Sequence, residues 1–350
     1  MLQILTTLLI LLNPVVAFFA PNRAPIQEAS QSKERGAAFV NFDEYKLPLA
    51  ENIFLASQLI PTYPIRNWNA AEPEISAKIA FVFETTRQRI LWQKNGLRAK
   101  RPIASLTKLM TALVVMENAK LDDVFTVSKK AVQTSGELGG LIVGEQLTVE
   151  NLLYALLVES SNDAAAALAE NISKNLAFDS AMLRSDNNNL SLEPARLAEA
   201  SGEAQVEGVT LFVDLMNQKA KSLGLTDTTF TDPSGLDPSN QSSAWDLNIL
   251  MREFLKYPVL QKITQTATFD FKSVDAKFSH RLTSTDKLLG QYPEIIAGKT
   301  GYIEEAGNCM ILAFRAPNNQ GTVVSIIIDS QDRMAESAAI LKWTKEAFLW

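Results

Sequence analysis

The chain of 350 residues is 47% apolar and 21% charged, and its formal net charge is −6. These values are those of an ordinary globular protein with enough apolar residues for a core of normal density. The sequence has no basic stretch that could follow a phosphate backbone. We therefore exclude nucleic acid as the main partner, because phosphate binding needs clustered Lys and Arg.

Two residue types are almost missing from the sequence. The single cysteine, Cys309, excludes an intrachain disulfide and a cysteine-rich zinc site, and we expect no metal and no cofactor. The single histidine, His280, is more informative, because most hydrolases use histidine as a general base or as a metal ligand. An enzyme of this composition must take its general base from lysine or from a carboxylate.

Residues 1–20 form an almost unbroken apolar run, with no charge before Arg23. Such a run is typical of an export signal, and Val15-Val16-Ala17 offers a small-residue cleavage site. The run lacks the usual basic start, and roughly 20 apolar residues are also enough to cross a bilayer. A cleaved signal peptide and a retained anchor, which would attach the protein to the membrane, both stay open. Either one predicts export, to the outer face of the cytoplasmic membrane, the periplasm or the cell wall.

Residues 21–74 are mixed in composition and interrupted by prolines, and we interpret them as a spacer of unknown role. The compact domain is expected at 75–350. Alternating apolar residues predict strands, which are at 77–84, 89–93, 309–315 and 322–329. Helical periodicity predicts helices, which are at 104–120, 149–159, 164–173, 211–222, 243–256 and 332–349.

Helices that lie between an early hairpin and late strands predict an antiparallel sheet built from both chain ends and covered by helices. The expected fold class is therefore α/β, of the α+β type. Residues 174–207 break the pattern with a polar stretch that contains few aromatic residues. We expect an inserted surface loop there, partly disordered.

Ser105-Leu106-Thr107-Lys108 lies at the start of the first long predicted helix. Residues three apart share a helix face, so Ser105 and Lys108 can meet. A lysine in an apolar pocket loses its proton more easily, because burial disfavours the charged form. A neutral Lys108 could then take the proton of Ser105 and make this serine a nucleophile.

Ser160-Ser161-Asn162 falls in a short break between two predicted helices. The Ser160 hydroxyl could relay protons between Lys108 and a leaving amine, and the Asn162 amide is suited to holding a peptide bond. Taken alone, helix capping would also explain Ser and Asn at this place.

Lys299-Thr300-Gly301 follows the apolar residues IIAG and precedes Tyr302. A cation beside a hydroxyl suits a substrate carboxylate, and Gly301 would let an extended peptide approach a strand edge. Taken alone, this tripeptide is most simply a turn.

The three short motifs are informative in combination. S-x-x-K, S-x-N and K-T-G elements in this order are typical of penicillin-binding proteins and class A β-lactamases. The near-absence of histidine fits Ser–Lys chemistry and argues against a Ser–His enzyme. Cys309 and His280 are interpreted as structural residues.

The chain resembles the low-molecular-mass penicillin-binding proteins of the D-alanyl-D-alanine carboxypeptidase family. The likeness covers about residues 75–350, apart from 174–207. It rests on the trio and on five longer stretches, which are IASLTKLMTALVVME, LLYALLVESSNDAAAALAE, FVDLMNQKAKSLGL, FTDPSGLD and AGKTGYIEEAGNCM. The resemblance implies a β-lactamase/transpeptidase-like fold, in which an all-helical subdomain lies beside the antiparallel sheet.

The resemblance also implies an activity: a penicillin-binding, serine-type carboxypeptidase that removes the terminal D-alanine from peptidoglycan stem peptides. Ser105 would form the acyl-enzyme, Lys108 would be its base, and Ser160 would complete the proton path. Asn162 would hold the substrate. β-Lactams would inhibit the enzyme by acylating the same serine.

The remaining roles follow from the same resemblance. Lys299 and Thr300 would bind the carboxylate of the terminal D-alanine, beside Gly301. The backbone N–H groups of Ser105 and Tyr302 would form the oxyanion hole. One departure is Ser161, which stands where the family commonly has glycine.

Three alternatives stay open. A D,D-endopeptidase that cuts peptidoglycan cross-links would use the same residues. A β-lactamase would need a glutamate for deacylation, and Glu193-Pro194 lies in a polar stretch with Leu197 where a polar partner is needed. A catalytically silent wall-binding protein could keep the fold, but the intact trio argues against it.

Overall fold

The computed structural model describes residues 64–134, 140–188 and 203–350. The predicted export signal, most of the predicted spacer and Glu193 lie outside the described residues. Among the helices that are described, none is both long enough and apolar enough to span a bilayer.

The central element is a five-stranded antiparallel sheet. Its strands, from one edge to the other, are β10 (Ile295–Ile303), β11 (Gly307–Arg315), β12 (Thr322–Ser330), β2 (Ile79–Glu84) and β3 (Arg89–Lys94). The predicted early hairpin and the two late strands are confirmed, and they meet where β12 pairs with β2. The edge strand β10 was not predicted, because its residues IIAGKTGYI were interpreted as a turn.

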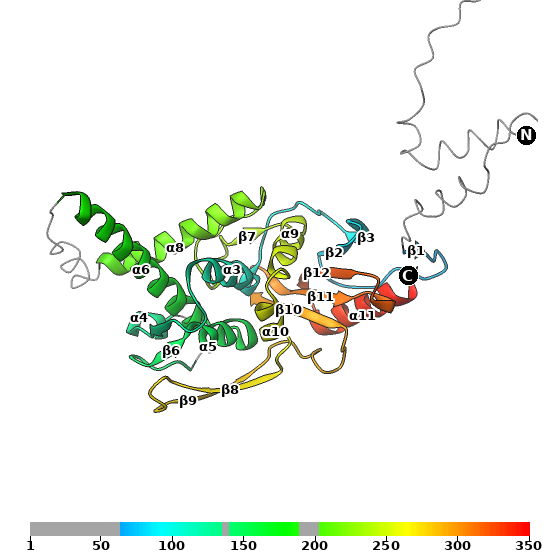
Figure 1. The fold of residues 1–350 in the computed structure, drawn as a ribbon. Helices are drawn as coiled ribbons and strands as arrows, with labels where there is room; N and C mark the ends of the chain where they lie inside the picture. Colours follow the sequence, from blue (N-terminus) through cyan, green and yellow to red (C-terminus); the bar gives the residue numbers. More distant parts are fainter. Residues whose placement is uncertain (1–63, 135–139, 189–202) are drawn as a thin grey trace, which may run out of the picture. The chain divides into compact units, whose positions relative to one another are not determined.

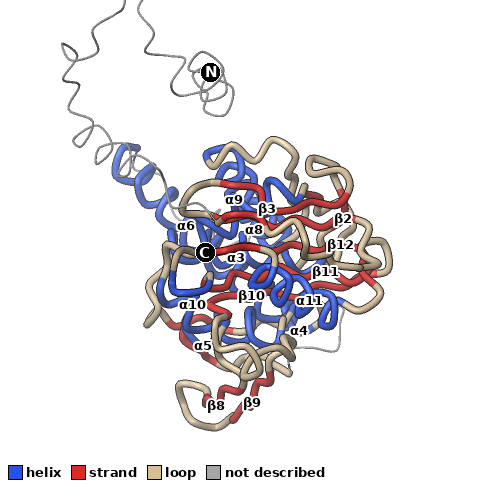
Figure 2. The backbone as a smooth tube through the Cα atoms, turned by 90° about the vertical axis from the view of Figure 1, so that its right-hand side faces the viewer, coloured by secondary structure: helices blue, strands red, loops and turns tan. Residues whose placement is uncertain are grey.

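Each face of the sheet is buried against helices. Along β2, Phe81 and Phe83 join the core on one side, whereas Ala80 and Val82 join the core on the other. This alternation follows from the period of two in a strand. Helix α11 (Arg333–Glu346) covers the second side, lying along β11 and β12 in Figure 2, and α9 (Ala244–Phe254) packs on the first side.

Helices form the second part of the domain. Helix α3 (Lys108–Asn118) is its centre, and the residues from Lys108 to Val115 are all buried. The others are α4 (Lys129–Val132), α5 (Val149–Tyr154), α6 (Asn162–Asn188), α8 (Glu203–Ser222) and α10 (Pro258–Thr264). Figure 1 shows α3 between this group and the sheet. The predicted combination of an antiparallel sheet with a helical subdomain is confirmed.

Pairs of short antiparallel strands from the chain between β3 and β10 lie outside the central sheet. They are β4 (Arg101–Pro102) with β7 (Gln241–Ser242), β5 (Val124–Thr126) with β6 (Gln146–Thr148), and β8 (Thr268–Lys272) with β9 (Ser279–Thr283). The hairpin of β8 and β9 extends away from the body of the domain in Figures 1 and 2. Two of the helices begin at a capping side chain: Thr148 caps α5 and Ser243 caps α9.

The prediction of a surface loop at 174–207 is wrong for the described residues in this range, because 174–188 and 203–207 are helical. Helix α6 continues to Asn188, and α8 begins at Glu203. The polar composition suggested a loop, but residues 162–188 contain no proline and no glycine, so nothing interrupts the alanine-rich helix. Residues 189–202 lie outside the described part of the chain.

The domain begins earlier than the predicted boundary at residue 75. Strand β1 (Ile65–Arg66) pairs with β13 (Phe348–Leu349) at the other end of the chain. The Arg66 guanidinium lies 5.1 Å from the ring centroid of Trp343 and donates to the carbonyl of Ala347. A strand of two residues has no periodicity, so the sequence pattern could not reveal it.

We expect residues 64–74 to stabilise the domain. A chain that begins at residue 75 loses the β1–β13 pairing and the Arg66 contacts, so its Tm should fall by about 5 °C or more relative to a chain that begins at residue 62. Thermal unfolding followed by circular dichroism measures this difference. Equal Tm values for the two chains would restore the boundary at residue 75.

Candidate active site

Ser105 lies in the 3-10 turn η3 (Ala104–Thr107), which leads directly into α3. The residue before it, Ala104, is held at φ 49°, in the left-handed region that side chains other than glycine rarely adopt. Such backbone strain persists only where the surroundings enforce it, and it is frequent at active sites. One helical turn later, Lys108 Nζ donates to Ser105 Oγ at 2.8 Å, as the S-x-x-K spacing predicts.

The Lys108 ammonium is fully buried and makes three hydrogen bonds. Besides Ser105 Oγ, it donates to Asn162 Oδ1 at 2.7 Å and to the Ser234 carbonyl at 2.8 Å. Burial lowers the pKa of Lys108 to about 7, and the nearby Asp232 carboxylate opposes this change. A substantial fraction of this lysine is therefore neutral near pH 7, which is the state required of a general base.

The third partner of Lys108 comes from a loop that the motifs did not include. Asp232 holds this loop in shape, because its carboxylate accepts hydrogen bonds from the N–H groups of Ser234, Gly235 and Asp237. The Ser234 carbonyl is thereby aimed at Lys108. The only sequence signal for this role was the stretch FTDPSGLD, which was singled out by resemblance and given no function.

Gly235 brings this loop into contact with the turn that carries Ser105. Its φ of +86° suits glycine, and a Cβ atom there would lie 2.0 Å from the carbonyl oxygen of Ala104. No other residue fits at that distance. The loop of Asp232 and the turn that carries Ser105 therefore touch through their backbones.

The Ser160-Ser161-Asn162 segment follows a π-helical turn, η4 (Ala155–Glu159), at the end of α5. Irregular turns of this kind occur frequently at functional sites. Ser160 itself is left-handed, with φ 67°, and this residue directs the chain from η4 into α6. Ser161 caps α6, because its Oγ accepts from the N–H of Ala164 at 3.0 Å. The departure from glycine at this position thus has a structural role.

The K-T-G segment lies on the edge strand β10, and its lysine reaches the S-x-N turn. Lys299 Nζ donates to Ser160 Oγ at 2.8 Å and to the Thr300 carbonyl at 2.9 Å. Burial lowers the pKa of Lys299 well below its usual value, and the positive charges of Lys108 and Arg333 lower it further. The Thr300 hydroxyl is hydrogen-bonded to that of Thr285 at 2.7 Å.

Gly301 brings β10 close to Ser105. A Cβ atom at this position would lie 3.1 Å from the Ser105 backbone nitrogen, which is closer than an ordinary van der Waals contact. The next residue, Tyr302, has a side chain that is 61% exposed, and its predicted contribution is its backbone N–H alone. The structure thus brings the three motifs together around Ser105 from α3, from the start of α6 and from β10.

Arg333 is a further charged residue at this edge that the sequence interpretation missed. It is the first residue of α11 and donates to the Gly301 carbonyl at 2.8 Å. Its guanidinium adds a second cation beside Lys299, which is consistent with its effect on the Lys299 pKa. Arg333 lies outside any short motif, so only the fold could reveal it.

A cavity of about 430 Å³ adjoins the site on the Asn162 side. Asn162, Ala166 and Glu170 line it from one face of α6, and Ser234 and Leu236 line it from the Asp232 loop. Ser105, Lys299 and Thr300 are not among its lining residues.

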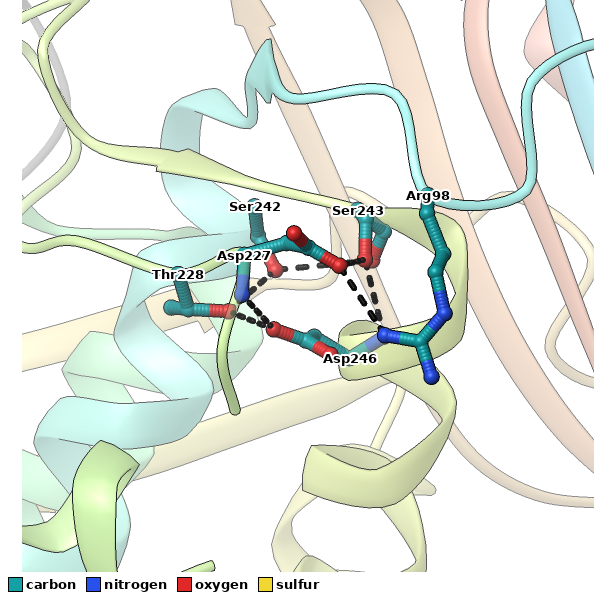
Figure 3. Close-up of polar contacts among 6 residues, drawn as sticks. All are labelled: Arg98, Asp227, Thr228, Ser242, Ser243 and Asp246. Atoms are coloured by element: carbon teal, nitrogen blue, oxygen red, sulfur yellow. Dashed lines mark hydrogen bonds and ion pairs between the residues drawn. The ribbon is translucent and has the colours of Figure 1, made fainter. Parts of the chain in front are cut away.

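A partly buried polar cluster joins the segment before Ser105 to the start of α9 (Figure 3). Asp246, in the first turn of α9, accepts from the N–H of Asp227 at 2.7 Å and from the Thr228 hydroxyl at 2.8 Å. Arg98 pairs with Asp227 at 3.2 Å. The capping box at the start of α9 is therefore only half formed: Ser243 Oγ accepts from the Asp246 N–H, but the Asp246 carboxylate accepts from the preceding loop and not from the Ser243 N–H.

Both residues that were interpreted as structural have structural surroundings. Cys309 is fully buried in β11. His280 lies in β9, where its ring stacks on Phe271 and its Nε2 is 2.8 Å from Glu145 Oε2.

Comparison with known proteins identifies the class. In fold, the chain is similar to the D,D-transpeptidase of Streptomyces K15, with a TM-score of 0.64 and 26% identity over 78% of this chain and 98% of the other. A family model described as D-alanyl-D-alanine carboxypeptidase matches residues 66–208 and 203–332. The chain belongs to this D-alanyl-D-alanine carboxypeptidase family, and the predicted transpeptidase-like fold is confirmed.

Curated relatives carry two activity names. The chain is 30% identical to the D-alanyl-D-alanine carboxypeptidase DacF of Bacillus subtilis, over 78% of this chain and 62% of that protein. It is 27% identical to a D-alanyl-D-alanine endopeptidase of Pseudomonas aeruginosa, over 78% of both chains. The chain thus spans less than two thirds of the length of the DacF relative.

We expect the rate of acylation by penicillin to follow the ionisation of Lys108. For a lysine base with a pKa of about 7, which acts in its neutral form, the rate should level off above pH 7 and fall about tenfold per pH unit below it. Stopped-flow labelling with a fluorescent penicillin measures this profile.

Lys108→Ala should abolish labelling while the circular dichroism spectrum stays unchanged. Near-normal labelling of the Lys108→Ala variant would rule out Lys108 as the base.

We expect the cluster of Figure 3 to stabilise the domain. Asp246→Ala leaves the Asp227 N–H and the Thr228 hydroxyl without their acceptor, and should lower the free energy of unfolding by about 2–4 kcal/mol. Urea denaturation measures this loss. Asp122→Ala, at an exposed carboxylate, is the matched control and should change the stability by less than about 0.5 kcal/mol. Equal stability of both variants would show that the cluster contributes nothing.

Proposed function

We propose that the chain is a penicillin-binding, serine-type D-alanyl-D-alanine carboxypeptidase that removes the terminal D-alanine from peptidoglycan stem peptides through an acyl-enzyme. The observation that carries the proposal is the buried Lys108 ammonium, with a pKa of about 7, 2.8 Å from Ser105 Oγ. Family membership and the absence of any other base beside Ser105 in the hydrogen bonds of the described site support it.

Acylation starts with the transfer of a proton from Ser105 Oγ to neutral Lys108 Nζ. The serine oxygen then attacks the carbonyl carbon of the penultimate D-alanine. The negative charge that develops on the carbonyl oxygen is stabilised by the backbone N–H groups of Ser105, in the turn η3, and of Tyr302, on β10; the two segments approach each other at Gly301. These donors are fixed in place before the reaction, so they need no reorganisation.

The leaving amine must then receive a proton. Protonated Lys108 returns its proton through the Ser160 hydroxyl, which passes its own proton to the amine of the departing D-alanine. Lys299 holds the Ser160 oxygen in position by donating to it at 2.8 Å. Water then attacks the ester, Lys108 accepts a proton from that water, and Ser105 leaves with the proton. Serine and lysine are thereby restored.

Substrate binding uses the two sides of the catalytic centre. Lys299 and Thr300 bind the carboxylate of the terminal D-alanine, and Arg333 adds positive charge at the same edge. The acyl part of the stem peptide passes Asn162 towards the cavity of about 430 Å³, which Lys299 does not line. β-Lactams resemble the D-alanyl-D-alanine end and acylate the same serine.

The apolar run at 1–20 supports export, and the substrate itself lies outside the cytoplasm. A signal peptide and a membrane anchor both agree with that run.

The endopeptidase name of the Pseudomonas aeruginosa relative makes cross-link cleavage the second candidate activity, with the same catalytic residues. Cleavage products distinguish the two activities.

We expect the protein to release free D-alanine from a pentapeptide that ends in D-Ala-D-Ala, and to leave cross-linked peptide dimers largely intact. Mass spectrometry of the products measures both reactions. Ser105→Ala should release no D-alanine and bind no fluorescent penicillin, because the acyl-enzyme cannot form. Cleavage of dimers at a higher rate than D-alanine release would assign endopeptidase activity. Release of D-alanine by the Ser105→Ala variant would show that Ser105 is not the nucleophile.

A further inference from the structure

Thr285 is a half-buried residue in the turn between β9 and β10 that the mechanism above does not use. Its side chain and its backbone each make one hydrogen bond to the active-site segments. The hydroxyl lies 2.7 Å from Thr300 Oγ1, in the K-T-G segment. The N–H donates at 3.1 Å to the Val158 carbonyl, in the turn η4 that leads into Ser160. Thr285 therefore joins the K-T-G strand to the turn that carries the chain into the S-x-N segment.

The backbone on both sides of Thr285 is fixed by hydrogen bonds. The N–H of Ser284, the preceding residue, donates to the Ala267 carbonyl at 2.8 Å. The N–H of Asp286, the following residue, donates to Ser284 Oγ at 3.1 Å. The Thr285 hydroxyl is therefore presented to Thr300 from a turn with a defined shape.

The Thr300 hydroxyl depends on Thr285 for its orientation. Thr300 is 3% exposed, and among the residues that the structure describes its hydroxyl has no other hydrogen-bond partner than Thr285. A hydroxyl has a single proton to donate. If Thr300 donates this proton to Thr285, none is left for an anion. If Thr285 is the donor, the proton of Thr300 is available to the carboxylate of a substrate.

The side chains of the K-T-G segment offer few donors. Lys299 Nζ has three N–H groups, and two of them donate to Ser160 Oγ and to the Thr300 carbonyl. One lysine donor and one threonine donor therefore remain for the terminal carboxylate. The direction of the hydrogen bond between Thr285 and Thr300 decides whether the carboxylate receives one of these hydrogen bonds or both.

We propose that Thr285 is a positioning residue for substrate binding: its hydroxyl donates to Thr300 Oγ1, so that the Thr300 hydroxyl donates to the terminal carboxylate of the substrate. Hydrogen bonds to a charged group are among the stronger ones, and two hydroxyls that donate in the same direction polarise each other. Thr285 acts through Thr300 and does not itself contact the substrate. Its role lies in binding, because the proton transfer at Ser105 does not involve the terminal carboxylate.

The test is Thr285→Val, which removes the hydroxyl but keeps the branched side chain and the N–H that donates to Val158. Two substrates are compared: a pentapeptide that ends in D-Ala-D-Ala, and the same peptide with its terminal carboxylate converted to a methyl ester. We expect KM for the free pentapeptide to rise about tenfold, because its carboxylate loses a hydrogen bond, while kcat changes little. The kinetics of the ester should be unchanged. Thr285→Ser keeps the hydroxyl and should restore the wild-type KM.

A double-mutant cycle measures whether Thr285 acts through Thr300. Thr300→Val alone should raise KM for the pentapeptide, and the addition of Thr285→Val should raise it no further. A further increase of about tenfold in the double variant would mean that Thr285 contacts the carboxylate independently of Thr300. That result would overturn the proposal.

Thr268→Val is the matched control, because it removes a hydroxyl from an exposed side chain in β8. It should leave the kinetics of both substrates unchanged. Equal losses with pentapeptide and ester, or a Thr285→Ser variant that behaves like Thr285→Val, would overturn the proposal and leave Thr285 a structural role alone. If Thr285→Val does not fold, Thr285→Ala must show the same selective rise in KM, and its absence counts equally against the proposal.

The inference rests on the proposed carboxypeptidase function, and the experiment separates the two. A wild-type protein that releases no D-alanine contradicts the function. A wild-type protein that does release it, together with a Thr285→Val variant that behaves identically, contradicts the inference only.

Discussion

The burial of the Lys108 ammonium is the constraint on which the rest of the site depends. An ammonium group loses its hydration in the interior, and it is tolerated there only when other atoms accept its hydrogen bonds. The fold supplies three acceptors from three separate segments, which are Ser105, Asn162 and Ser234. The same burial lowers the pKa of the lysine to about 7. The need for these acceptors and the lowered pKa of the lysine thus have one origin.

Much of the local structure around Lys108 can be understood as a means of fixing these acceptors. Asp232 shapes the loop that presents the Ser234 carbonyl, and Gly235 seats this loop against Ala104. The π-helical turn η4 and the left-handed Ser160 direct Asn162 into the core. Each of these features is locally unfavourable or unusual. Their concentration within a few residues of the three motifs agrees with strain that is maintained by the surrounding fold.

The parts of the fold that have strong periodicity could be predicted from the sequence: the early hairpin, the late strands, the central helix and the capped helices. The three motifs could be predicted to meet because their residue types are rare in combination and the family resemblance orders them. Strand β10 was missed because KTG looks like a turn in isolation. The start at β1 was missed because a pair of residues carries no pattern. The continuation of α6 was missed because polar composition was given more weight than the absence of helix breakers.

Roles that depend on distant contacts could not be predicted in the same way. Arg333 reaches the K-T-G segment from the last helix and belongs to no short motif. The Ser234 carbonyl is a backbone group, and its position depends on the hydrogen bonds of Asp232 and not on its own side chain. Only the assembled fold identifies such residues.

The close approach of Gly235 to Ala104 has a mechanical consequence. Because a methyl group would not fit between the glycine and the Ala104 carbonyl, any side chain at position 235 would push this loop away from the turn that carries Ser105. The neighbouring Ser234 carbonyl, which accepts from Lys108, would move with the loop. The hydrogen bonding of the buried ammonium therefore depends on the absence of a side chain at position 235.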